Sequence, residues 1–554
     1  MHTLQHVNNV MKLKNLGSYH PSRLSFARQL IITLIKENWV FKFQDWKINK
    51  LGKGYCIISV KNKKDAFSLI IFSHLIKDEE RSDRVIADKW DFTFSLFLGI
   101  PNDKELKHLK KNVPLQENGN HLKKQLTLSR ANKSTRLFDH FLKNLTKGLQ
   151  PEFEQVRKIG YLLRTTAVYG NGKFGIGDYN LKSDSKIIKN GFWAEMLTVY
   201  MLKIFSIEYV NFLAKNKSKN YTILNDNISN YLGTGNATGL GMAPFVVNHP
   251  KLIHSWINSK QKLIKFALDQ KSLSKNKLKL FLLLLENAKK HVDQWEVEDK
   301  KQQKIINETK KELDQIINSK ILFKKLNSDY PLKKIISKFN SINNETREVL
   351  NSIFLELFPE VTDSYSKKMN ISDKVTLNTN YSIAKLKSLI KQNYKWALQI
   401  NFNHSSSKYF FWYVSETKQE PRLGISIKDH GYKKRLPLDI AKQIYDLNET
   451  LKKIPSKMKI NEFCLKYYGY KSIIKRILIN EKYMFSEIKE NLVDKNMRPI
   501  DILRFKLSFF GACKFDPKSN LWTRITLFQG IPLPKNLKGN KTHLFSFPVL
   551  NSYG

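Results

Sequence analysis

Residues 192–213 read FWAEMLTVYMLKIFSIEYVNFL, the most apolar helical stretch in the chain. Its length would suit a membrane span, but Glu195, Lys203 and Glu208 interrupt it. Each of these charges would cost several kcal/mol in lipid. We therefore predict a helix in the core of the fold and expect no membrane partner.

Shorter elements precede this helix. Pro21 and Ser22 open an amphipathic helical stretch that reaches Ile35. Two runs of β-branched and aromatic residues, 55–60 and 67–72, flank a Lys-Asn-Lys-Lys-Asp turn and predict a hairpin. Helical spacing then covers residues 134–148 and continues from Val156 to about Arg164. The sequence thus predicts an α+β region over residues 1–125 and a helical region with two glycine-rich loops over residues 126–256.

Helices and strands are both expected after residue 256. Residues 257–325 are rich in Lys, Glu and Gln with helical apolar spacing, which predicts a long hairpin as an elaboration over residues 257–358. Residues 359–554 form a C-terminal α+β region, with strands expected at 409–415 and 521–527 and a helix at 438–451. A chain of 554 residues is too long for one core. The expected fold is α+β and mainly helical, with a small antiparallel sheet near the N-terminus.

Charge is the most unusual bulk property. The net charge is +46 and the pI is near 9.8, which suggests an anionic partner such as nucleic acid. However, about 80 of the 95 basic residues are Lys, and Asn and Ile are also frequent, as drift in an AT-rich coding sequence would produce. Recognition of phosphate more often uses the bidentate guanidinium of Arg. Charge alone therefore does not favour nucleic-acid binding.

Cysteine and histidine usage excludes several site classes. Cys56, Cys464 and Cys513 are far apart and form no Cys-x-x-Cys pair, so neither a disulfide framework nor a thiolate zinc site is indicated. His249 and His254 lack the spacing of a helical metal pair. We expect no metal site, a reducing compartment and a cytoplasmic location, and no cofactor is indicated.

The first candidate site is the segment 169–178, YGNGKFGIGD, whose glycines match Gly-x-Gly-x-x-Gly. A dinucleotide site needs a strand before this motif and a helix after it. The preceding residues look helical and the following ones look like loop. The segment is therefore not expected to bind a dinucleotide.

The second candidate is the segment 232–244, LGTGNATGLGMAP. Successive glycine N–H groups can converge on an anion, and Pro244 suits the first turn of a helix whose N-terminus also attracts one. Close packing of a tight connection explains the glycines equally well. Both interpretations stay open at this stage.

Our leading hypothesis joins the two segments as a site for a small phosphate- or carboxylate-bearing ligand, on a protein that need not be an enzyme. Asp178 or Glu195 would move a proton. The ligand would be held by Arg164, Gly170, Gly172, Lys173, Gly175, Gly233, Gly235, Asn236, Thr238 and Gly239. Structural roles explain each residue singly: a surface Lys, a helix-end Arg, a turn Asp and a core Glu paired to a cation. The alternatives are a nucleic-acid-binding protein with a Lys-rich surface and a helical protein that binds a partner.

Lys is used about five times as often as Arg in this chain. Positions that carry Arg are therefore candidates for sites that need a guanidinium group. Eight of about fifteen arginines lie in the first third of the chain, several beside Ser or Asp. Bidentate ion pairs and a ligand pocket would both select Arg over Lys. Structural ion pairs are the favoured explanation.

Overall fold

The computed structural model describes residues 10–17, 22–75, 77, 90–115, 121–165, 192–239, 250–319, 326–367, 380–404, 412–414, 421–423, 433–435, 439–487, 499–517, 522–537 and 547–550. The chain divides into two compact units, each built from segments far apart in sequence. The sheet unit comprises residues 18–238, 267–363 and 507–554. The bundle unit comprises residues 1–17, 239–266 and 364–506.

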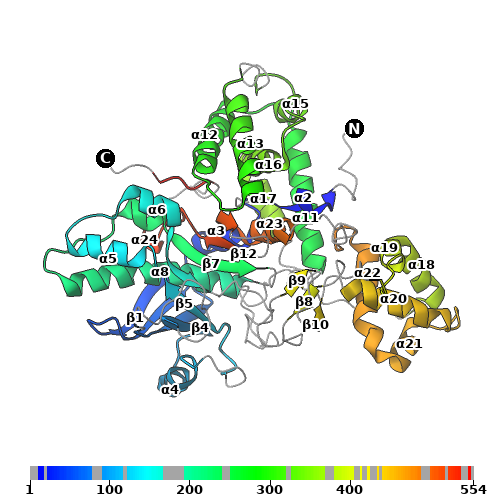
Figure 1. Ribbon diagram of the computed structural model, residues 1–554, viewed down its shortest axis with the longest axis horizontal. Helices are drawn as coiled ribbons and strands as arrows, with labels where there is room; N and C mark the ends of the chain where they lie inside the picture. Colours follow the sequence, from blue (N-terminus) through cyan, green and yellow to red (C-terminus); the bar gives the residue numbers. More distant parts are fainter. Residues whose placement is uncertain are drawn as a thin grey trace. The chain divides into compact units, whose positions relative to one another are not determined.

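A nine-stranded mixed sheet is the centre of the sheet unit (Figure 1). Its order is β1-β2-β3-β4-β5-β6-β7-β12-β11. Each pair of neighbours from β1–β2 to β5–β6 is antiparallel, and the pair β6–β7 is parallel. The strands are β1 (Val40–Ile48), β2 (Gly54–Lys61), β3 (Ala66–Ser73), β4 (Phe92–Leu98), β5 (Ser129–Lys133), β6 (Tyr161–Thr165), β7 (Gly233–Gly239), β11 (Ala512–Pro517) and β12 (Trp522–Leu527).

The expected hairpin is confirmed, because β2 and β3 pair with Tyr55 opposite Phe72. The mainly helical α+β class also agrees with the structure. The expectation of a small sheet is wrong, since strands from the middle and the end of the chain extend the N-terminal meander to nine. Short-range sequence patterns indicate a hairpin, but they do not indicate which strands several hundred residues away pair with it in the sheet.

Helix α8 (Trp193–Lys217) is the predicted core helix and covers one face of the sheet (Figure 1). Phe205 of α8 packs against Trp46 of β1 and Phe92 of β4. The opposite face is covered by α4 (Asp103–Asn112), whose Leu109 joins a core cluster with residues of β2, β3 and β4. In the described residues only α8 has the length and composition to cross a membrane, and 83% of its most apolar 18-residue window is buried inside the fold. Burial on all sides explains its continuous apolar composition.

The remaining helices of the sheet unit surround this core. The predicted helical hairpin is present as α12 (Lys275–Asp293) packed against α13 (Lys300–Ile317). The others are α3 (Phe26–Lys36), α5 (Phe138–Thr146), α6 (Phe153–Ile159), α9 (Asp226–Tyr231), α15 (Pro331–Lys338), α16 (Asn344–Glu356) and α24 (Pro534–Leu537), while α17 (Pro359–Ser366) crosses the unit boundary.

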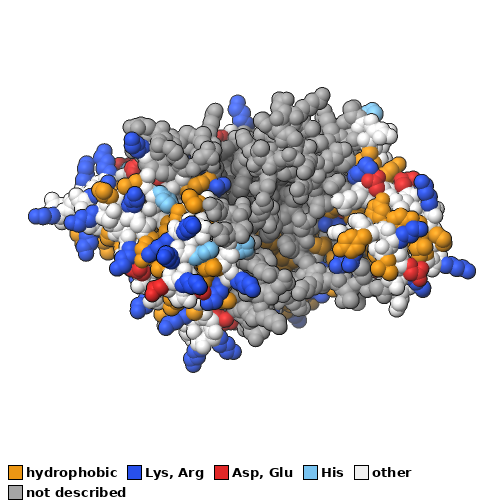
Figure 2. Space-filling model, turned by 90° about the horizontal axis from the view of Figure 1, so that it is seen from below, with side chains coloured by type: hydrophobic (Ala, Val, Ile, Leu, Met, Phe, Trp, Pro, Cys, Tyr) orange, Lys and Arg blue, Asp and Glu red, His pale blue; other side chains and the backbone are white. Residues whose placement is uncertain are grey.

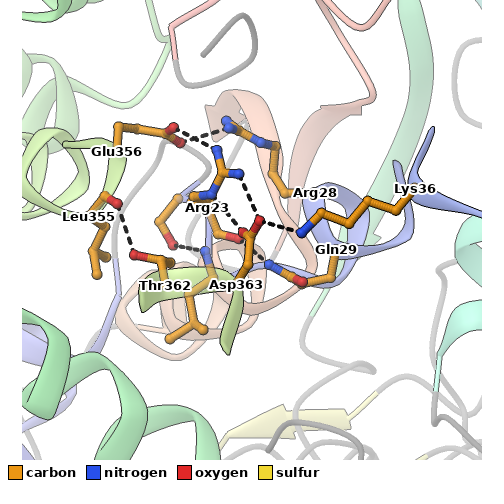
Figure 3. Close-up of polar contacts among 10 residues, drawn as sticks. Arg23, Arg28, Gln29, Lys36, Leu355, Glu356, Thr362 and Asp363 are labelled. Atoms are coloured by element: carbon orange, nitrogen blue, oxygen red, sulfur yellow. Dashed lines mark hydrogen bonds and ion pairs between the residues drawn. The ribbon is translucent and has the colours of Figure 1, made fainter. Parts of the chain in front are cut away.

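A buried ion-pair cluster joins the start of this unit to α16 and α17 (Figure 3). The guanidinium of Arg23 donates to both carboxylate oxygens of Asp363, at 2.7 and 3.0 Å, and to Glu356 at 3.3 Å. Arg28 of α3 donates to the other oxygen of Glu356 at 2.7 Å, and Lys36 donates to Asp363 at 3.0 Å. Arg23 and Arg28 therefore have structural roles, which agrees with the expectation that arginines in the first third of the chain form ion pairs.

The bundle unit contains a cluster of short helices, visible at the right of Figure 1. These helices are α18 (Ile383–Asn393), α19 (Lys395–Leu398), α20 (Asp439–Lys452), α21 (Ile460–Lys466), the 3₁₀ turn η5 (Tyr468–Tyr470) and α22 (Lys471–Lys482). A three-stranded antiparallel sheet of β8 (Trp412–Val414), β9 (Pro421–Leu423) and β10 (Lys433–Arg435) lies in the same unit, as does α2 (Leu13–Leu16). Helices α11 (Pro250–Leu268) and α23 (Pro499–Phe510) cross the boundary between the units.

Candidate functional site: an arginine-rich cleft

The segment 153–165 positions the first part of the site. The sequence predicted one helix from Val156 to about Arg164, and this is wrong. Helix α6 ends at Gly160, whose left-handed backbone (φ +77°) stops the helix, and β6 begins at Tyr161. Arg164 therefore lies on a strand, paired in register with Asn132 of β5 and Gly235 of β7.

A cleft of about 680 Å³ opens around this strand in the sheet unit. Seven cations line it, together with three carboxylates and few apolar side chains. The cations are Lys133, Arg136, Arg157, Lys158, Arg164, Lys514 and Arg524. The carboxylates are Glu154, Glu296 and Glu298. The excess of four positive charges would attract an anion to the cleft.

Arginine is concentrated in this cleft although it is scarce in the chain. Four of the fifteen arginines lie here, brought from residues 136, 157, 164 and 524. Arg157 is paired with Glu154 at 2.6 Å. In contrast, the structure shows no ion pair or hydrogen bond for the guanidinium groups of Arg136, Arg164 and Arg524 with any residue it describes. Within the described part of the chain, the donors of these three guanidinium groups are therefore not used by carboxylates or carbonyl groups.

Lys514 fixes the geometry of the cleft wall. Its Nζ donates to the backbone carbonyl of Arg157 at 3.1 Å and to that of Lys158, so it caps the end of α6. This holds α6 against β11, the edge strand that carries Lys514. Arg164 and Arg524 are mounted on strands and Arg157 on the capped helix, whereas Arg136 lies in the turn between β5 and α5.

The chemistry of the lining is that of binding. A planar guanidinium donates two parallel hydrogen bonds to phosphate, and the hydroxyls of Ser134, Thr135 and Thr526 add further donors. The lining contains no His or Cys. Among the residues that the structure describes, no group of three His, Cys, Asp or Glu side chains could hold a metal ion.

The glycine segments are placed only in part. Gly170, Gly172, Lys173, Gly175 and Asp178 lie outside the described residues. The expectation of a loop at 233–241 is wrong for residues 233–239, which form β7. Glycine is needed there for close packing: a Cβ on Gly233 would lie 2.4 Å from the carbonyl oxygen of Leu527, and one on Gly235 would lie 2.6 Å from the ring of Tyr161.

Two other predicted site residues lie where α8 meets β7. The hydroxyl of Thr234 on β7 donates to the carbonyl of Val199, one helical turn after Glu195, which is itself buried. Asn236 lies two residues beyond Thr234 and therefore on the same face of the strand. Its side chain is 1% exposed, and neither amide atom has a hydrogen-bond partner in the described structure. Thr238 and Gly239 complete β7.

Of the predicted ligand-binding residues, the cleft includes Arg164. Arg136, Arg157 and Arg524 were not selected as ligands from the sequence, although the scarcity of Arg was noted. Figure 2 shows Lys and Arg side chains scattered over the described part of one face. No known protein family, curated protein or solved structure matches the chain.

Proposed function

We propose that the arginine-rich cleft binds the phosphodiester backbone of a single nucleic-acid strand. The observation that carries this proposal is the set of three guanidinium groups, of Arg136, Arg164 and Arg524, that lie in one concave surface and make no ion pair or hydrogen bond with any residue that the structure describes. In a chain that uses Lys almost everywhere else, Arg at these positions suits bidentate contact with phosphate.

The polar character of the lining favours a polymer backbone over a compact small ligand. Pockets for small molecules are mostly apolar, with few polar groups, whereas this lining is mostly charged. A positively charged groove that follows the backbone is the usual means of binding a single strand.

The test uses the full chain and labelled single-stranded RNA and DNA of mixed sequence. The variant Arg164→Gln/Arg524→Gln removes two unpaired guanidinium groups without adding charge. The matched control is Lys63→Gln/Lys64→Gln, which removes two exposed charges from the turn between β2 and β3. Fluorescence anisotropy gives the affinity, and thermal unfolding checks that each variant folds.

We expect the arginine variant to weaken strand binding by about tenfold or more and the control to change it by less than about twofold. A second variant at more exposed positions, Arg136→Gln/Lys158→Gln, should weaken binding in the same direction. Equal affinities for wild type and both cleft variants would refute the proposal. Cleft-dependent binding of a nucleoside triphosphate, with no binding of strands, would replace the polymer by a small polyphosphate.

A small anionic ligand near the glycine segments is a second proposal. The buried, unpaired amide of Asn236 supports it, because such a group costs about 1–3 kcal/mol unless a partner arrives. Its test is Asn236→Leu. If a ligand pairs with this amide, the variant should lose thermal stabilisation by nucleotides or sugar phosphates that the wild type shows. Unchanged stabilisation by these ligands would exclude this role of Asn236.

A further inference from the structure

Two helices of the bundle unit, α21 and α22, are joined by a tight turn. Helix α21 ends at Lys466, the turn passes through η5, and α22 begins at Lys471. A helix, a short turn that contains glycine, here Gly469, and a second helix follow one another in the same order as in a helix-turn-helix. In DNA-binding versions, residues near the start of the second helix face the major groove.

The turn is held rigidly from inside. Phe463 of α21 stacks on Tyr467, with ring centroids 4.8 Å apart, and also on Tyr470. The hydroxyl of Tyr470 lies 2.9 Å from that of Thr450 on α20. These contacts connect α20, α21 and the turn into one packed structure.

The middle of α22 is held by an ion pair. The guanidinium of Arg476 makes hydrogen bonds of 2.6 and 2.7 Å with the carboxylate of Glu487, which is nearly fully buried. The hydroxyl of Tyr394, at the end of α18, reaches the same carboxylate at 3.1 Å. Arg476 therefore has a structural role, and the neighbouring lysines are left to face solvent.

The outer surface of the turn combines exposed apolar groups with positive charge. Leu465 is 86% exposed and Tyr468 is 73% exposed, and a Cβ added to Gly469 would meet no atom within 4 Å. Residues 463–480 contain Lys466, Lys471, Lys475 and Arg476 but no Asp or Glu. Figure 2 shows, at the right, hydrophobic side chains exposed among Lys and Arg on the bundle.

The charged and aromatic groups lie together. The Nζ of Lys471 lies 5.3 Å from the ring centroid of Tyr468, and Ser472 beside it is exposed. Lys475 lies one helical turn after Lys471, on the same side of α22. The first turn and a half of α22 thus presents two lysines and a serine next to an exposed tyrosine.

We infer that the surface formed by residues 465–475 docks on duplex DNA, with the start of α22 in the major groove. Lys466, Lys471 and Lys475 contact phosphates, while Ser472 and Tyr468 face base edges and sugars. Charge complementarity selects this partner, because Lys466, Lys471 and Lys475 outnumber the one nearby exposed carboxylate on α21, that of Glu462, and a net positive surface matches a phosphate backbone. This site is independent of the arginine-rich cleft, which takes a single strand.

The experiment compares the full-length protein with Lys471→Gln/Lys475→Gln. The matched control is Lys391→Gln/Lys395→Gln, two exposed lysines of α18 and α19 in the same unit. Anisotropy is measured on a mixed-sequence duplex of about three helical turns and on a single strand. Protection of guanine N7 from dimethyl sulfate reports contact in the major groove.

The inference predicts that Lys471→Gln/Lys475→Gln weakens duplex binding by about tenfold or more, lowers its salt slope by about 2 and removes the N7 protection. Single-strand affinity and the control should be unchanged. Arg164→Gln/Arg524→Gln should weaken single-strand binding and leave duplex binding unchanged, so the two proposed sites are tested separately. Duplex affinity that is absent in the wild type, or equal in all variants, would overturn the inference. Selective loss of single-strand binding in the lysine variant would also overturn it.

Discussion

Arg28 and Glu356 are 328 residues apart in the chain, yet the guanidinium of Arg28 donates to the carboxylate of Glu356 at 2.7 Å with both side chains buried. The second oxygen of Glu356 accepts from Arg23 at 3.3 Å. One carboxylate therefore balances parts of two buried guanidinium groups and joins α3 to α16 (Figure 3). Loss of this carboxylate would remove one acidic partner from each of the two buried guanidinium groups.

Glu356→Gln should lower the free energy of unfolding by about 3 kcal/mol, because breaking one side of a buried pair leaves an uncompensated charge. Chemical denaturation of the full chain measures this change. Glu360→Gln, an exposed acid at the start of α17, is the control and should cost no more than a few tenths of a kcal/mol. Equal stability of Glu356→Gln and the wild type would contradict a stabilising role for the cluster.

The same cluster predicts a pH dependence. Burial tends to raise the pKa of Asp363, but hydrogen bonds and charges from Arg23 and Lys36 outweigh it, so the pKa lies below the usual value. A depressed carboxyl pKa contributes stability that is present above the unfolded pKa of about 3.9 and is lost as the pH falls through the folded value. Asp363→Asn should therefore be less stable than the wild type at neutral pH. Its stability should also fall less steeply between about pH 5 and 3 in denaturation curves.

Lys203 is a buried cation held by backbone oxygens. Its Nζ donates to the carbonyls of Asn230 at 2.9 Å and Phe528 at 3.2 Å, and to that of Ile531. Lys203→Met would leave these carbonyls buried without a donor and should cost about 3 kcal/mol. Lys215→Met, at an exposed position in the last turn of α8, is the control for denaturation. A Lys203→Met protein as stable as the control would show that the carbonyls find other partners.

Gly235 is required for space. Gly235→Ala should destabilise the protein by about 1–3 kcal/mol, because the new methyl group would overlap the ring of Tyr161. The cost should shrink in a Tyr161→Leu background, which a double-mutant cycle of unfolding free energies would reveal. Gly469→Ala, where the added methyl meets nothing, should be close to neutral. An equal cost of Gly235→Ala in both backgrounds would point to backbone effects instead.

Local patterns in the sequence were sufficient for the elements whose partners are near in sequence. Two runs of β-branched and aromatic residues and a polar turn predicted β2 and β3, and continuous apolar composition predicted α8. β6 was mistaken for helix because Tyr161–Thr165 is too short to show a period of its own, and the stop at Gly160 was not recognised. β7 was mistaken for a loop because its glycines serve close packing rather than a turn.

The candidate site was harder to predict from the sequence for a related reason. Arg164 was selected from the sequence, but Arg524 lies 360 residues away and reaches the cleft only because β12 pairs beside β7. No local pattern encodes that pairing. The sequence feature that could have indicated the site is the use of Arg in a chain that otherwise uses Lys. Arg occurs both in the buried cluster around Arg23 and in the cleft. Contacts alone separate these roles: Arg23 is paired with carboxylates, whereas the structure gives Arg164 and Arg524 none among the described residues.

The most direct test of the strand-binding cleft is the salt dependence of single-strand affinity for the wild type and for Arg164→Gln/Arg524→Gln. Each phosphate neutralised by a cation adds about 0.7 to the slope of log affinity against log salt concentration. If both guanidinium groups contact phosphate, the slope of the variant should be smaller by about 1.4. A variant slope equal to that of the wild type would contradict the account, because strand binding would then be due to charges elsewhere on the surface.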